Sequence, residues 1–180
     1  KKIIEIFQSK LGNKDFVPED VEFFKIGKKY HVLKVDTLVE STDIPPGIKL
    51  EDVARKSIVS CISDFAAKGV EPIFGIVSLT IPKKYSKFKI ESLAKGFYKA
   101  RKEFNLKILG GDTNEGKELV INFSLFGTSE KIVKRNGAKM NDVIITSGPF
   151  GYTSSGLNIL LNHKKYSKKF GNKAKKVVFT

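Results

Sequence analysis

Apolar side chains recur at intervals of three or four residues in four segments of the chain, and this period is typical of amphipathic helices. The predicted helices cover residues 3–11, 50–68, 90–104 and 154–161. Gly12 follows the first helix and Gly69 follows the second, and glycine is the preferred residue where a helix ends in the left-handed conformation. The pattern therefore predicts both the helices and the ends of two of them.

Shorter apolar runs bounded by turn residues predict strands. These runs cover residues 21–26, 30–35, 73–81, 106–109, 119–126 and 142–146, and residues 177–180 are similar to the start of another strand. The first two runs flank Gly27 and predict a β-hairpin. Pro82 marks the end of the third run, because proline lacks the N–H that a strand interior requires.

The order of these elements predicts an α+β fold, with a mixed or antiparallel sheet and helices on one face. We expect a first domain over residues 1–136 and the start of a truncated second α/β domain over residues 137–180. We also expect the structure to continue beyond Thr180 in a longer relative.

Composition narrows the classes of function. With 41% hydrophobic residues the chain can bury a core, and its longest apolar run is too short to cross a bilayer. One cysteine and two histidines exclude an internal disulfide and a Cys- or His-rich metal cluster. No signal peptide opens the chain, and we expect a cytoplasmic protein.

The formal net charge of +14 is concentrated near the C-terminal end. Seven lysines lie between Lys164 and Lys176, around Tyr166 and Phe170. A basic tail of this kind leaves a nucleic-acid-binding module open as an alternative function, although solvated surface lysine is the more ordinary explanation.

Carboxylates stand at the edges of the predicted elements. Asp20 precedes the first strand, Asp36 leaves the second, Asp64 lies inside an apolar helix and Asp112 follows a double glycine. Mg²⁺ prefers oxygen ligands and is usually held by a few carboxylates, water and substrate phosphates. The same residues are common helix caps and turn residues, but Asp64 fits that explanation least well.

Two further segments could contact phosphate. Gly110, Gly111 and Asp112 could bring backbone N–H groups close to an anion, or could form an ordinary turn. Arg135, between predicted strands, could pair with a phosphate through its planar guanidinium group, or could be a solvated loop residue. His31 and Cys61 are expected to be structural.

Four motifs in a fixed order carry a family resemblance. They are Val35-Asp36-Thr37-Leu38-Val39, the run from Ser63 to Pro72, Leu109-Gly110-Gly111-Asp112-Thr113-Asn114, and Arg135-Asn136-Gly137-Ala138-Lys139 followed by Asp142. Together they resemble the N-terminal part of the thiamine-monophosphate kinases, in the aminoimidazole-ribonucleotide-synthetase superfamily. The segment from Thr42 to Gly47 resembles the archaeal type of that family.

The resemblance implies an ATP-dependent kinase that phosphorylates thiamine monophosphate to the diphosphate by direct phosphoryl transfer, and a homodimer formed through the sheet. It implies Mg²⁺ ligands at Asp20, Asp36, Asp64 and Asp112, with an electrostatic role for Asp64 and Asp112 and no catalytic nucleophile. Nucleotide contacts fall on Gly111, Asp112 and Arg135, and the thiamine phosphate contact falls on Asp43.

The chain also departs from the family pattern. Pro18-Glu19-Asp20 stands where relatives often have Gly-Asp-Asp, and Lys34 and Val35 stand where they often have hydroxyl residues. Family members carry a C-terminal domain beyond the length of this chain, so we expect incomplete activity at this length. A synthetase of the same superfamily that uses another acceptor remains an alternative.

Overall fold

The computed structural model describes residues 2–13, 16–146, 148–162 and 164–166. Its elements are α1 (Lys2–Leu11), β1 (Glu22–Ile26), β2 (Lys29–Val39), α2 (Glu40–Asp43), α3 (Leu50–Lys68), β3 (Glu71–Pro82), α4 (Lys87–Glu103), β4 (Lys107–Gly116), β5 (Val120–Ser129) and α5 (Tyr152–Leu161). The expected α+β class is confirmed. The expected strand at residues 177–180 lies outside the described residues, as does most of the lysine-rich tail.

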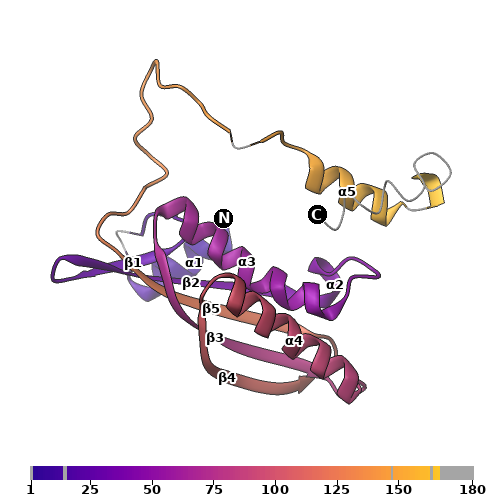
Figure 1. The fold of residues 1–180 in the computed structure, drawn as a ribbon. Helices are drawn as coiled ribbons and strands as arrows, with labels where there is room; N and C mark the ends of the chain where they lie inside the picture. Colours follow the sequence, from indigo (N-terminus) through magenta and orange to yellow (C-terminus); the bar gives the residue numbers. More distant parts are fainter. Residues whose placement is uncertain (1, 14–15, 147, 163, 167–180) are drawn as a thin grey trace.

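The five strands form one mixed sheet in the order β1-β2-β5-β3-β4. β5 is antiparallel to both β2 and β3, whereas β3 and β4 are parallel. Parallel neighbours need a crossover connection, and α4 supplies it between β3 and β4. In Figure 1, α3 and α4 cover one face of this sheet, which confirms the expected layering, and we call the other face the open face.

Side chains of the strands point alternately to the two faces of the sheet, and those that point toward α3 and α4 form the core. Every second residue of β5 from Ile121 to Gly127 is buried. The largest fully buried side chains include Phe65, Ile58, Leu93, Phe123, Ile121, Leu125 and Val32. They come from α3, α4, β2 and β5, so α3 and the centre of the sheet are held by the same packed core.

The ends of α3 agree with the sequence. The helix ends at Lys68, and Gly69 has a φ of 70° and donates its N–H to the carbonyl of Ala66. Glycine adopts this left-handed conformation at little steric cost, because it has no Cβ atom. Gly69 is therefore a reliable local signal for the end of the helix, and the sequence predicted that end correctly. The helix thus ends directly after Lys68, four residues beyond Asp64.

Two strand predictions were wrong. Gly110, Gly111 and Asp112 lie inside β4, which continues to Gly116, because these residues pair with β3 from Ile76 onward. Residues 142–146, all of them described, form no strand, and Val143, Ile144 and Ile145 are more than 80% exposed. An apolar run becomes a strand only where a neighbouring strand accepts its hydrogen bonds.

The strand that carries Asp36 is also longer than expected. β2 continues to Val39 and pairs with β5 as far as Val120. Asp36 is therefore not at the exit of the strand but inside it, opposite Phe123. Among the described residues no helix is long and apolar enough to span a membrane.

Candidate functional site

A row of alternating charges lies along the second half of α3. Asp64 and Lys68 are four residues apart on this helix, so their side chains project from the same side of it. Asp64 forms an ion pair with Lys34 of β2, and Lys68 forms one with Glu19, in the segment before β1. We refer to Glu19, Asp20, Lys34, Asp36, Asp64, Lys68 and Arg135 as the α3 charge row.

The first half of the row joins β2 to α3. Lys34 and Asp36 are two residues apart on β2 and face the helices. The Nζ atom of Lys34 lies 2.6 Å from Oδ2 of Asp64 and 3.9 Å from Oδ2 of Asp36. Burial by itself lowers the pKa of Lys34, but the hydrogen bond to Asp64 and the charge of Asp36 outweigh it, and the pKa lies above its usual value.

The second half of the row joins α3 to the segment before β1. Lys68 is 3% exposed and forms an ion pair with Glu19, and its Nζ atom lies 3.5 Å from Oδ2 of Asp20. The hydrogen bond from Lys68 holds the pKa of Glu19 below its usual range. Arg135 completes the arrangement, with a guanidinium nitrogen 2.7 Å from Oδ1 of Asp20.

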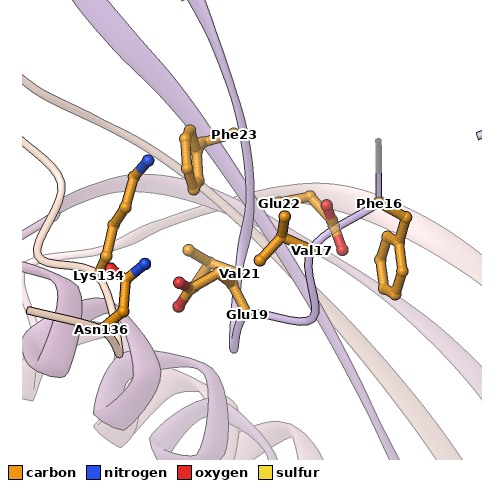
Figure 2. A pocket seen from close by; sticks show the side chains of 8 residues that line it. All are labelled: Phe16, Val17, Glu19, Val21, Glu22, Phe23, Lys134 and Asn136. Carbon is orange, nitrogen blue, oxygen red and sulfur yellow. The ribbon is translucent and has the colours of Figure 1, made fainter. Parts of the chain in front are cut away.

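A pocket of about 320 Å³ opens beside Glu19. Its lining residues are Phe16, Val17, Glu19, Val21, Glu22, Phe23, Lys134 and Asn136. Figure 2 shows the polar ends of Lys134 and Asn136 on one side of the pocket and Phe16 on the other. Half of the lining side chains are apolar and half are charged or polar, and the volume lies at the lower end of the range for small-molecule sites. Glu19 lines the pocket and also pairs with Lys68, so the pocket adjoins the charge row at this residue.

The structure brings three of the four predicted metal ligands to this row and leaves the fourth elsewhere. Asp20, Asp36 and Asp64 belong to it, but Asp112 does not. Asp112 pairs with Ser78, in line with Asn122 and Thr37 on the open face, and its carboxylate accepts a hydrogen bond from Asn114. Within one chain, Asp112 is therefore on the opposite side of the sheet from Asp36 and Asp64.

Two other predicted contact residues have local partners. The Asp43 carboxylate accepts the backbone N–H of Val39, which lowers the pKa of Asp43, and it also accepts the hydroxyl of Thr42. Gly111 lies against the carbonyl oxygen of Val77 so closely that a Cβ atom would overlap it. The β3–β4 pairing thus accounts for Gly111 without reference to any ligand.

The expected structural roles of His31 and Cys61 are supported by their surroundings. His31 stacks on Phe24 with ring centres 5.6 Å apart, on the open face. Cys61 is buried in α3, where burial raises the pKa of its thiol to about 12. A thiol of this kind stays protonated at neutral pH and is a poor nucleophile.

Sequence reasoning named Arg135 but missed the other two cations of the charge row, Lys34 and Lys68. Lys34 lies at an inward position of β2, in step with buried Val32 and Leu38, and Lys68 is the buried last residue of α3. A lysine at an inward position is rarely buried without a carboxylate partner. The alternation pattern of β2 was therefore a usable signal for Lys34.

The mixed sheet with helices on one face, and the charged side chains paired between α3 and β2, define an α+β domain. The family model described as "AIR synthase related protein, N-terminal domain" matches residues 18–129. The chain belongs to this family, and the match spans the sheet from the segment before β1 to the end of β5.

Several relatives are similar over nearly the whole chain. A thiamine-monophosphate kinase of Nitrosopumilus maritimus is 57% identical over 98% of the chain, and one of Pyrococcus horikoshii is 29% identical over 97%. The structure of AaThiL complexed with AMPPCP and TMP aligns with 98% of the chain at a TM-score of 0.86 and 25% identity. The chain spans 56% of the length of both kinases and 57% of the AaThiL chain.

Proposed function

We propose that the chain is the N-terminal part of an ATP-dependent kinase that phosphorylates thiamine monophosphate to thiamine diphosphate. The observation that carries this proposal is the α3 charge row, found in a chain that is 57% identical to a thiamine-monophosphate kinase. The similarity to AaThiL, which was captured with AMPPCP and TMP, supports both substrates. We retain the division into a domain at residues 1–136 and the start of a second at residues 137–180.

The proposed reaction needs placement and charge neutralisation rather than a protein nucleophile. The terminal phosphorus of ATP forms a bond to a phosphate oxygen of thiamine monophosphate while its bond to ADP breaks. Arg135 is 62% exposed and lies between the pocket residues Lys134 and Asn136, so its guanidinium group could contact a nucleotide phosphate. The buried, protonated thiol of Cys61 takes no part in this chemistry.

The carboxylates of the charge row could hold Mg²⁺ only if a bound substrate supplied further ligands to the ion. No three His, Cys, Asp or Glu side chains of the described residues lie together closely enough to hold a metal ion. Mg²⁺ is commonly bound by one or two carboxylates together with phosphates and water, and Asp36 and Asp64 could supply these carboxylates. A bound Mg²⁺ would neutralise charge on the transferred phosphoryl group.

Binding of a nucleotide analogue should depend on Asp64. We expect Asp64→Ala to weaken Mg²⁺-dependent binding of AMPPCP by about tenfold or more, because a lost charged contact costs about 1.5–3 kcal/mol. Isothermal titration calorimetry with and without Mg²⁺ measures this change. Asp52→Ala is the matched control, since Asp52 is an exposed carboxylate at the start of the same helix. Failure of the unaltered chain to bind the analogue would contradict the proposal.

The open face of the sheet supports the homodimer that we propose. It carries Phe24, Leu33, Val35 and Ile76, which are 44–60% exposed. Phe74 and Phe126 stack beside them with ring centres 4.8 Å apart. A continuous apolar sheet face on a folded domain is typical of an interface. In such a dimer Asp112, on the same face, would lie at the contact between the two sheets.

An aspartate placed on the open face should separate the dimer. We expect Val35→Asp to shift the chain from dimer to monomer, because a charge without a partner is costly in an apolar interface. Sedimentation velocity gives the mass of each form. Phe88→Asp is the control, as Phe88 is 78% exposed on α4 and far from this face. A dimer that persists in Val35→Asp would place the interface elsewhere.

A further inference from the structure

Lys34 occupies the place between two carboxylates that a divalent cation would also prefer. Its side chain is 17% exposed, and its ammonium group is in contact with Asp64 while it faces Asp36. Asp64 is 27% exposed and Asp36 is 40% exposed, so water can reach both carboxylates. The chain therefore carries its own cation at this point of the α3 charge row.

The charges of Lys34, Asp36 and Asp64 determine how strongly these side chains bind a metal ion. Asp36 and Asp64 together carry two negative charges, of which Lys34 neutralises one. A divalent cation that approaches the pair is attracted by the carboxylates and repelled by the ammonium group at short range. To use both carboxylates as ligands it must displace the ammonium group of Lys34.

We propose that Lys34 is a resident counter-ion that weakens binding of a free divalent cation to Asp36 and Asp64 and makes that binding depend on the nucleotide. This inference rests on the proposed function. A lysine side chain has a flexible four-carbon stem, so the displaced ammonium group can turn to a nearby phosphate. Nucleotide phosphates supply ligands for the cation and a new partner for Lys34.

The consequence is positive coupling between the metal and the nucleotide. Each ligand should raise the affinity for the other, and by the same factor, because coupling free energy is reciprocal. Without the positive charge of Lys34, the two carboxylates would attract the cation in the absence of nucleotide. Lys34 is in this account a positioning residue, which acts through Asp36 and Asp64.

Direct titration with Mn²⁺, followed by electron paramagnetic resonance, tests the inference without any activity measurement. We expect Lys34→Met to bind free Mn²⁺ about tenfold or more tightly than the unaltered chain, and Lys34→Arg to bind it as weakly. Lys29→Met removes the same charge from an exposed position of β2 and should change nothing. Asp64→Asn added to Lys34→Met should abolish the gain.

Repeating the titration with AMPPCP separates this inference from the proposed function. The nucleotide should tighten Mn²⁺ binding strongly in the unaltered chain and much less in Lys34→Met. If AMPPCP binds but Lys34→Met leaves the affinity for free Mn²⁺ unchanged, Lys34 is not a counter-ion of this kind, and the kinase proposal stands. If AMPPCP does not bind, the kinase proposal fails instead. Lys34→Gln keeps a hydrogen-bond donor and replaces Lys34→Met if circular dichroism shows that variant unfolded.

Discussion

Replacing Phe123 by alanine is expected to lower the free energy of unfolding by about 3–5 kcal/mol, the usual cost of truncating a buried phenylalanine. Phe123 is fully buried at the centre of the sheet, where its ring lies against Gly75 and leaves no space for a Cβ atom there. Its carbonyl oxygen accepts a hydrogen bond from the thiol of Cys61 on α3. The cavity would thus open between β5, β3 and α3.

Urea unfolding followed by circular dichroism measures this loss. Phe88→Ala is the control, since Phe88 is 78% exposed and its truncation should change stability by less than about 0.5 kcal/mol. Phe123 pairs with Asp36 across β2 and β5, so the variant should also loosen the ion pairs of Lys34. Equal stability of the two variants would mean that the centre of the sheet is not the main core.

Gly96→Ala is expected to destabilise the chain by about 1–3 kcal/mol, although alanine normally favours a helix over glycine. Gly96 lies where α4 crosses α3. A Cβ atom there would overlap the carbonyl oxygen of Glu51 and would lie 2.7 Å from its Cα and 2.8 Å from the Cβ of Ala54. Backbone atoms cannot move aside as a flexible side chain can, so the helices must separate.

The same unfolding experiment measures this effect, with Ala94→Gly as its control. Ala94 is exposed on α4, and its replacement should cost about 1 kcal/mol through helix propensity alone. If both variants lose stability, helix propensity explains the loss in Ala94→Gly but not the loss in Gly96→Ala, where propensity alone predicts a gain. Packing between the helices then outweighs helix propensity at position 96. A stabilised Gly96→Ala variant would show that α3 and α4 are farther apart than the structure places them.

The helices were predictable because their signals are local. The apolar residues of α3 recur at helical spacing, and the glycine that caps the helix follows directly in the sequence. The helix ends at Lys68, as expected. The start of α4 was missed by three residues, because its N-cap, Ser86, stands before the apolar pattern begins. The class of fold followed from the order of the elements.

The errors arose where distant residues decide the structure. Gly110 to Asp112 look like a turn in isolation, yet β3 holds them in a strand. Residues 142–146 have the composition of a strand and no neighbour to pair with among the described residues. Lys68 was missed for the same reason, because its carboxylate partners lie in the distant segment before β1.

The order of strands in the sheet has a consequence for biosynthesis. β5 is the last of the five strands of this sheet to be made, yet it lies at the centre, between β2 and β3. Until it leaves the ribosome, the β1–β2 hairpin and the β3–α4–β4 unit have no strand to join them, and their apolar faces stay uncovered. The domain therefore gains its cooperative core in one late step, which cannot occur before Ser129, the last residue of β5, has been synthesised.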